Sequence, residues 1–300
     1  MNARAPELAA PQALELVAAD GYRLAAHWWP SAGPAAAVVV INPATAVKAE
    51  YYHRYATFLA EHGLAALTYD YRGIGASRRG SLRQCKTISK RDWGCYDCEA
   101  ALRQARRFCP DLPLYVVGHS IGGLLLGLAP SAGEVCRALT VGAQYAYWRD
   151  YGPGKALMWL RWHLLMPLLT ALCGYFPARR LGWHEDLPAA AAYEWAYRPA
   201  TLEAAYGVGP DDELLRHFAE MRGELLAIGI EDDPFGTPAA LERLLAYYRN
   251  ARRRHVRIAP ASVGVAAIGH FAWFNSRFRD TLWQESLDWL RDGRSRPAKA

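Results

Sequence analysis

The chain has 300 residues, of which 52% are hydrophobic, and its formal net charge at neutral pH is +6. This length permits one large domain or two small ones, and so high an apolar content excludes a disordered chain. The basic residues lie in short, separated runs, and no nucleic-acid-binding motif accompanies them, so we expect no nucleic-acid partner.

The N-terminus and the cysteines bear on location and redox chemistry. Residues 1–12, MNARAPELAAPQ, lack the apolar segment of a signal peptide, and we expect a cytoplasmic protein. The closest cysteine pair, Cys95 and Cys98, falls in a stretch with the pattern of an amphipathic helix, and no second close pair accompanies it. We therefore expect reduced thiols, without a metal site or a disulfide.

The first predicted elements are two strands on either side of Asp20-Gly21. This dipeptide is typical of tight hairpins, so we expect an antiparallel hairpin to lead the sheet. A continuous β-branched run that ends at Ile41 predicts a strand buried on both faces. A helix over 50–61 and a second strand over 63–70 follow.

The same alternation of strands and helices continues along the chain. We expect further strands over 112–119, 138–143, 224–230 and 254–259, and further helices over 91–108, 121–128, 238–248 and 281–290. Such alternation predicts an α/β fold with a mostly parallel sheet and helices on both faces.

One segment, residues 145–221, breaks this alternation and has the pattern of helices interrupted by proline and glycine. Its most apolar part is long enough for a membrane span. However, Arg161 near the middle would cost about 2.5–3.5 kcal/mol in a bilayer, and Pro167 would kink the helix. We predict a helical cap over 145–221 on a core formed by residues 1–144 and 222–300. Contact of the cap with a membrane surface stays open.

The motif GHSIG at 118–122 joins a predicted strand directly to a predicted helix. A turn this sharp crowds the residues two before and two after its centre, so only small side chains fit, and Gly118 and Gly122 meet this need. The turn would raise the Ser120 hydroxyl beside the free N–H groups of the helix N-terminus. We predict that Ser120 is a catalytic nucleophile.

A nucleophilic serine needs a base, and the base needs an acid that orients it. His270 is the histidine that follows a predicted strand in a loop, at the sheet edge where reacting groups gather. His119 lies in the turn itself, and we expect its side chain to point away from Ser120. We predict that His270 is the base.

The acid should follow the predicted strand over 224–230, where Glu231, Asp232 and Asp233 stand together. Asp233 precedes a proline and lies farthest along the turn, so it is our first choice. Asp232 is the second choice and Asp150 the third. The order serine, aspartate, histidine along the chain is the order described for α/β hydrolases.

The chain resembles the serine hydrolases of the α/β-hydrolase fold, in particular a poorly characterised group of predicted bacterial α/β hydrolases. The resemblance rests on YDYRGIGAS (69–77), RDWG (91–94), VVGHSIGG (116–123), GYFPARRLG (174–182), EDLP (185–188) and IGHFAWF (268–274). It implies a central, mostly parallel sheet with a helical cap, and a triad of Ser120, Asp233 and His270.

Two further segments compare with that superfamily. The Asp70 to Gly75 segment resembles its D-x-R-G-x-G motif, and we interpret it as structural, with Arg72 paired to a carboxylate. Many α/β hydrolases have His-Gly after the first parallel strand, where this chain has Asn42-Pro43. Because Pro43 has no N–H, we expect the oxyanion hole to use the N–H of Ala44, or of a residue near it, together with the N–H of Ile121.

These residues predict hydrolysis of a carboxylic ester or thioester through an acyl-enzyme, without a cofactor or metal. We expect a small substrate with a hydrophobic group of medium length, under a cap rich in apolar side chains: Trp148, Trp159, Trp162, Leu164, Leu165, Met166, Leu168 and Leu169. An acyltransferase with the same triad and a non-catalytic ligand-binding protein are the alternatives. The oligomeric state has no signal in the sequence.

Overall fold

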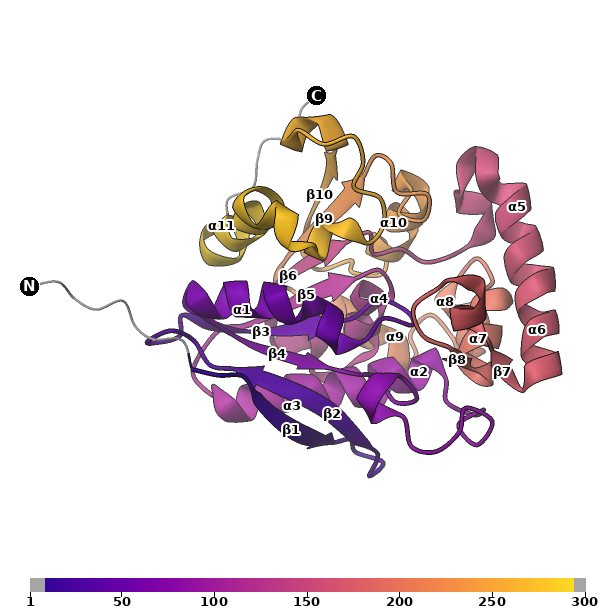
Figure 1. The fold of residues 1–300 in the computed structure, drawn as a ribbon, viewed down its shortest axis with the longest axis horizontal. Helices are drawn as coiled ribbons and strands as arrows, with labels where there is room; N and C mark the ends of the chain where they lie inside the picture. Colours follow the sequence, from indigo (N-terminus) through magenta and orange to yellow (C-terminus); the bar gives the residue numbers. More distant parts are fainter. Residues whose placement is uncertain (1–8, 294–300) are drawn as a thin grey trace, which may run out of the picture.

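An eight-stranded sheet forms the centre of the protein in a computed structural model that describes residues 9–293 (Figure 1). The strand order is β1-β2-β4-β3-β5-β6-β9-β10. Six strands run parallel: β3 (Ala37–Asn42), β4 (Leu64–Tyr69), β5 (Leu114–His119), β6 (Val135–Val141), β9 (Glu224–Ile230) and β10 (Arg252–Ile258). The mostly parallel sheet predicted from the alternation is confirmed.

The sheet begins with the predicted hairpin. Strands β1 (Gln12–Val17) and β2 (Arg23–Trp29) pair antiparallel, and β2 also pairs antiparallel with β4. Gly21 adopts a φ of 82°, which favours glycine, and the Tyr22 N–H donates to Asp20 Oδ1 at 3.2 Å.

Helices cover both faces of the sheet. Helices α1 (His53–Glu61) and α11 (Gln284–Asp292) pack on one face. The other face carries α3 (Glu99–Phe108), α4 (Ile121–Leu128), α9 (Glu213–Glu220) and α10 (Pro238–Leu245). Every residue of β3, β4 and β5 is buried as a result, which explains their continuous apolar runs.

The predicted helix over 91–108 has an irregular start. It consists of α2 (Lys90–Asp92), a π-helical turn over Trp93–Cys98, and α3. Ser89 caps it, because its hydroxyl accepts from the Asp92 N–H at 3.1 Å while Asp92 Oδ2 accepts from the Ser89 N–H at 2.8 Å. A Cβ at Gly94 would lie 2.5 Å from Leu128, so this glycine allows α4 to approach closely.

The segment between β6 and β9 forms the mostly helical region predicted from the sequence. It contains α5 (Lys155–Trp159), α6 (Met166–Cys173), α7 (Ala189–Ala196) and α8 (Leu202–Tyr206). A two-residue ladder of β7 (Tyr175–Phe176) and β8 (Leu187–Pro188) was not predicted. The last helix of the segment, α9, packs on α4 of the core, where Phe218 lies against Gly127.

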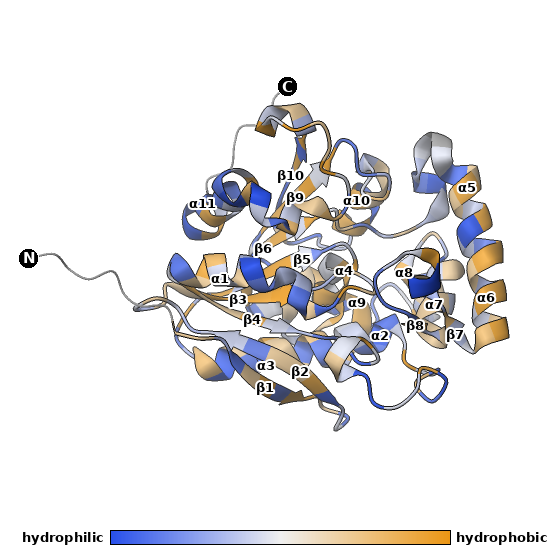
Figure 2. Cartoon of the chain, in the orientation of Figure 1, coloured by the Kyte–Doolittle hydropathy of each residue, from blue (hydrophilic) through white to orange (hydrophobic). Residues whose placement is uncertain are grey.

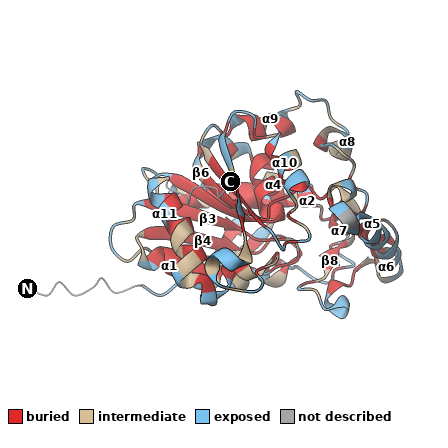
Figure 3. Ribbon diagram, turned by 90° about the horizontal axis from the view of Figure 1, so that it is seen from above, coloured by how far each residue is buried: buried red, intermediate tan, exposed pale blue. Residues whose placement is uncertain are grey.

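Helices α5 and α6 form one continuous helix over Lys155–Cys173, which is long and apolar enough to cross a membrane by length and composition alone. Pro167 does not break it, because a π-helical turn over Leu160–Leu165 shifts the hydrogen bonding just before the residue that lacks an N–H. Figure 2 shows the apolar residues along this helix, and Figure 3 shows it at the outer edge of the molecule, away from the buried sheet.

Candidate active site

Ser120 stands between the last residue of β5 and the first residue of α4, with φ 53° and ψ −117°. Few residues other than glycine adopt such angles, and strain of this kind is typical of functional turns. A Cβ at Gly118 would lie 2.8 Å from the Gly123 nitrogen, and a Cβ at Gly122 would collide with the Asn42 carbonyl. The two glycines therefore have the steric role predicted for them.

His270 and Asp233 lie together beside this turn. His270 Nδ1 is 2.7 Å from Asp233 Oδ2, both side chains are buried, and Asp233 Oδ1 accepts from the Phe235 N–H at 2.8 Å. Burial opposes ionisation of Asp233, but the charge and hydrogen bond of His270 and nearby backbone N–H groups outweigh it and hold the pKa of this carboxyl below its usual value.

The other candidate acids have different partners. Asp232 accepts from the N–H groups of Ile268 and Gly269 at 2.9 and 3.0 Å, so it fixes the backbone before His270. Asp150 forms a bidentate ion pair with Arg243 at 2.6 and 2.8 Å. The structure thus places Asp233, the first choice, against the imidazole.

Ser120 and His270 line the same cavity of about 320 Å³. Among the described residues, Ser120 Oγ has no hydrogen bond to His270, and the Nε2 atom of His270 has no protein partner. Such contacts often tighten only when a substrate binds.

The predicted oxyanion donors differ in availability. Ile121 is the first residue of α4 and lines the cavity, and the first N–H groups of a helix have no partner within it. The Ala44 N–H instead donates to the Tyr52 hydroxyl at 2.9 Å, which disagrees with its predicted role. The next residue, Thr45, also lines the cavity, and its N–H has no acceptor among the described residues.

Tyr52 belongs to a buried hydrogen-bond chain that the sequence did not reveal. Its hydroxyl lies 2.7 Å from His119 Nδ1, and His119 Nε2 lies 2.9 Å from the His270 carbonyl. Because that carbonyl only accepts, we assign the proton of His119 to Nε2, which leaves Nδ1 to accept from Tyr52. Burial, and then the charge of His270, lower the pKa of His119 to about 3.

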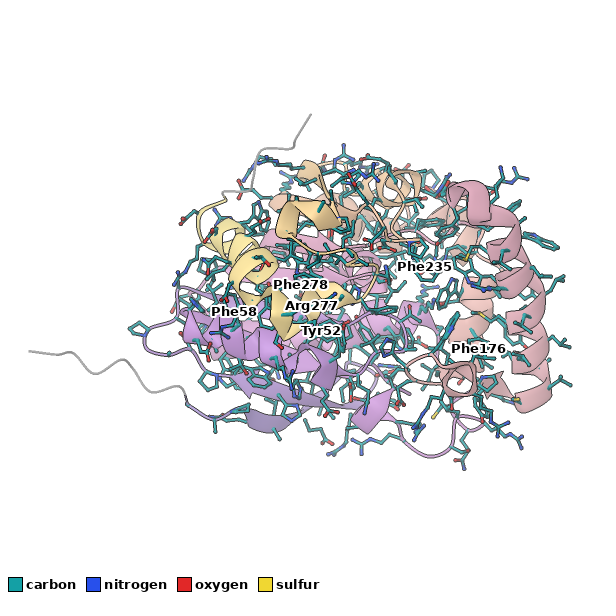
Figure 4. The ribbon with its side chains drawn as sticks, turned by 45° about the horizontal axis from the view of Figure 1, so that its top comes forward. Tyr52, Phe58, Phe176, Phe235, Arg277 and Phe278 are labelled. Carbon is teal, nitrogen blue, oxygen red and sulfur yellow. The ribbon has the colours of Figure 1, made fainter. Side chains whose placement is uncertain are left out.

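The side chains around the cavity were predicted only in part. About half of the eight apolar cap residues were expected to roof Ser120 and the rest to fasten the cap, but none of the eight borders the cavity. Leu164, Leu165 and Leu168 are exposed on the outside of the cap, whereas Trp162 and Met166 are buried inside it. The lining instead includes Ala44, Ala46, Lys90, Gln144, Arg161, Trp183, His184, Trp195, Phe235 and Phe271. Figure 4 shows Phe235 on the side of the core that faces the cap.

The Asp70 segment is structural, as expected. Asp70 accepts from the N–H groups of Ala49 and Ala76 at 2.7 and 2.8 Å. Arg72 pairs with two carboxylates, those of Asp97 at 2.7 Å and Asp20 at 2.6 Å, which confirms the predicted pairing.

Within residues 9–293, no group of three or more His, Cys, Asp or Glu side chains could hold a metal ion. All six cysteines, which fall in this range, are unbridged.

Comparison with known proteins agrees with this fold. Residues 33–177 match the family described as serine aminopeptidase, S33, and no curated protein sequence matched the chain. A soluble variant of the monoglyceride lipase from Saccharomyces cerevisiae, solved with a substrate analogue, is similar with a TM-score of 0.66 and 14% identity over 99% of this chain and 98% of that one.

Two further solved structures resemble the chain. A carboxyl esterase from Bacillus coagulans has a TM-score of 0.62 and 11% identity over 94% of this chain and 98% of its own. An esterase from Pyrococcus furiosus has a TM-score of 0.59 and 15% identity over 94% and 90%. The predicted α/β-hydrolase fold and the predicted resemblance to serine hydrolases of that fold are confirmed, and the chain is a hydrolytic enzyme.

Proposed function

We propose that this α/β-hydrolase-fold enzyme cleaves carboxylic esters or thioesters that carry a hydrophobic group, through an acyl-enzyme formed on Ser120. One observation carries the proposal: a serine held in a strained strand-to-helix turn shares an apolar cavity with His270, whose Nδ1 is hydrogen-bonded to a buried carboxylate. A nucleophile, a base and an orienting acid require this arrangement.

The mechanism follows from these positions. His270 Nε2 takes the Ser120 proton as the hydroxyl oxygen attacks the carbonyl carbon, and it then gives that proton to the departing alcohol or thiol. Asp233 holds the imidazole orientation and stabilises the imidazolium. The N–H groups of Ile121 and Thr45 receive the oxyanion. Water then attacks the acyl-enzyme, and the same histidine removes its proton.

The charges of the cavity favour an ester over a peptide with a free N-terminus. An aminopeptidase must bind the α-ammonium group of its substrate, and a carboxylate is the side chain that does so. The described residues that line the cavity include no Asp or Glu, and two of them, Lys90 and Arg161, are basic. An ammonium group would therefore meet repulsion in this site.

The apolar lining favours a hydrophobic substrate. Alanine, tryptophan and phenylalanine side chains make up much of the wall. Each buried methylene contributes about 0.8 kcal/mol, so four extra methylenes would favour an ester by about 3 kcal/mol, or more than a hundredfold in kcat/KM.

The test is kcat/KM for p-nitrophenyl esters from acetate to dodecanoate, at concentrations below micelle formation, with Ser120→Ala as the inactive control. We expect a maximum between four and ten carbons and no turnover by Ser120→Ala. A steady fall from the acetate onward would contradict the hydrophobic pocket, and turnover by the variant would contradict the role of Ser120.

We also propose that the outer face of α5–α6 contacts a membrane surface. Leu157, Leu164, Leu168 and Leu172 are exposed along it, and the most exposed of them, Leu172, retains 72% of its accessible surface. Lys155 and Arg161 on the same helix are exposed and would attract anionic headgroups. Arg161 also borders the cavity, so the same helix carries the exposed leucines and part of the cavity wall.

A further inference from the structure

A buried lysine lies in the wall of the cavity that contains Ser120. Lys90 is only 2% exposed, and its Nζ lies 4.3 Å from the centre of the Trp195 ring. Among the described residues, this amino group has neither a hydrogen bond nor an ion pair. Because Lys90 lines the cavity, a molecule bound there could contact it.

The nearest buried charges do not neutralise Lys90. Glu194 Oε2 accepts from the Lys90 backbone N–H at 2.7 Å and forms no ion pair with the Lys90 amino group, although its charge favours the protonated amine. Arg198 is 4% exposed, its Nε and Nη1 have no hydrogen-bond partner, and its guanidinium lies 5.4 Å from the Tyr145 ring centre. Two buried basic side chains therefore lie near a single carboxylate, that of Glu194.

Within the described part of the chain, the Lys90 amino group lacks a negatively charged partner within hydrogen-bond distance. Burial and the charge of Arg198 hold the pKa of Lys90 well below its ordinary value, against the smaller effect of Glu194. A lysine that only packed against Trp195 would be better replaced by an uncharged side chain such as methionine, because a buried charge without a partner is costly. An anion in the cavity would supply the missing partner.

We propose that Lys90 binds an acidic group of the substrate, so that the preferred esters carry a carboxylate on their hydrophobic chain. The proposal rests on the proposed ester hydrolysis and names its substrate class: monoesters of medium-chain dicarboxylic acids, or esters of medium-chain hydroxy acids. The apolar wall holds the methylenes, Lys90 pairs with the carboxylate, and the ester carbonyl lies at Ser120. A charge-assisted hydrogen bond in this dry site is stronger than one in water.

The kinetic test uses pairs of p-nitrophenyl esters of equal chain length, one neutral and one ending in a carboxylate, from the succinate to the suberate monoester. The measured quantity is the ratio of kcat/KM for the charged ester to that for the neutral ester. We expect at least one pair for which Lys90→Met lowers this ratio tenfold or more. Lys90→Gln, a second neutral variant of different shape, should lower it as well.

Lys86→Met is the matched control. Lys86 is exposed on the same segment and does not border the cavity, so this variant removes one positive charge from the protein without removing one from the site. The control should keep the wild-type ratio, which separates local binding from the general attraction of a basic protein for anions. If the wild type, both Lys90 variants and Lys86→Met have equal ratios, Lys90 does not bind a carboxylate on the acyl chain of the ester.

A second arm places the carboxylate on the alcohol side, as in the hexanoyl ester of 6-hydroxyhexanoate compared with hexyl hexanoate. A Lys90-dependent ratio in either arm supports the proposal and tells which side of the ester bond the lysine faces. The absence of Lys90 dependence in both arms overturns it.

Binding without turnover separates this inference from the proposed hydrolysis. In a Ser120→Ala background, calorimetry compares monomethyl suberate with methyl octanoate. We expect the charged ligand to bind more tightly, and Lys90→Met to abolish the difference while Lys86→Met retains it. Lys90-dependent binding in a protein that hydrolyses no ester would refute the proposed function alone. Hydrolysis with no Lys90-dependent preference would refute this inference alone.

Discussion

His270 is held by two neighbouring carboxylates that do different work. Asp233 binds the imidazole at Nδ1, and Asp232 binds the backbone N–H groups of Ile268 and Gly269. The first contact sets which nitrogen carries the proton, whereas the second sets where the loop lies. Removal of Asp233 should therefore disturb the protonation of His270, whereas removal of Asp232 should disturb the position of its loop.

Asp233→Asn should lower kcat by about three to four orders of magnitude, because an amide at this position favours the wrong imidazole tautomer. Asp232→Asn should lower it far less, because the amide oxygen can still accept one of the two backbone hydrogen bonds. Steady-state kinetics on the best p-nitrophenyl ester measure both. If Asp232→Asn proves the more damaging, the orienting role belongs to Asp232.

His119 should make stability depend on pH. Its folded pKa of about 3 lies below the 6.5 of an ordinary histidine, so between these values the unfolded chain binds a proton here that the folded protein does not. The contribution of the neutral His119 imidazole to the free energy of unfolding is therefore fully present above pH 6.5. It is lost as the pH falls toward 3. In urea unfolding between pH 7 and 5, wild type should lose up to about 1.4 kcal/mol per pH unit more than His119→Gln.

Glutamine suits this comparison because its amide can still donate to the His270 carbonyl but does not titrate. His53, whose pKa is lowered to about 4 mainly by burial, is present in both proteins and cancels. Identical pH dependence in the two proteins would show that His119 is not the group responsible.

Among the elements, the turn after β6 limits the space around Asp233 and His270. Gly142 has a φ of 56°, and a Cβ there would lie 2.8 Å from Asp233 Oδ2 and 3.1 Å from the His270 ring. Gly142→Ala should therefore displace the pair and lower kcat/KM about a hundredfold, since a shift near 1 Å can cost that much.

Gly264→Ala is the control for this substitution. Gly264 also has a positive φ, 73°, but a Cβ there would meet nothing within 4 Å. It should reproduce the backbone strain of an alanine with positive φ and leave kcat/KM near the wild-type value. Equal losses of activity in the two variants would attribute the effect to strain and not to contact with Asp233 and His270.

The cap helix α5–α6 is the element to test for lipid contact. Leu168→Glu with Leu172→Glu should weaken sedimentation with anionic phospholipid vesicles at least tenfold, because charges replace exposed apolar side chains. Val17→Glu with Phe108→Glu changes exposed apolar residues of β1 and α3, far from the cap, and should have little effect (Figure 1). Equal binding by both double variants would contradict the proposed contact.

The order of elements could be predicted because each core strand is a short run of apolar, often β-branched residues, as in the strand that ends at Ile41. The turn at Ser120 was visible because Gly118 and Gly122 lie at fixed offsets from it. The π-helical turn over Trp93–Cys98 was not visible, since one wider turn changes the apolar spacing too little.

The cavity wall could not be predicted for a different reason. Lys90 and Trp195 reach it through contacts between segments distant in sequence, and nothing in either local pattern marks them. Ala44 lost its predicted role because Tyr52, on the following helical turn, folds back and takes its N–H. The leucines of α5–α6 were expected beneath the cap, but the helix turns them toward solvent.

At the scale of the whole molecule, strand order assembles the site. β5, β6, β9 and β10 are successive neighbours in the sheet, and Ser120, Gly142, Asp233 and His270 follow them in the same order. Parallel strands bring their carboxyl ends to one edge, so residues far apart in the sequence meet there. The cap then covers this edge and leaves a cavity that Ser120, His270 and Lys90 line.

The central claim, that Ser120 is the nucleophile, is tested most directly by reaction with a fluorophosphonate followed by peptide mapping. We predict a single labelled residue, Ser120, and no labelling of Ser120→Ala, whose thermal unfolding should stay within a few degrees of wild type. Labelling that persists in a folded Ser120→Ala protein, or that maps to another residue, would contradict the account.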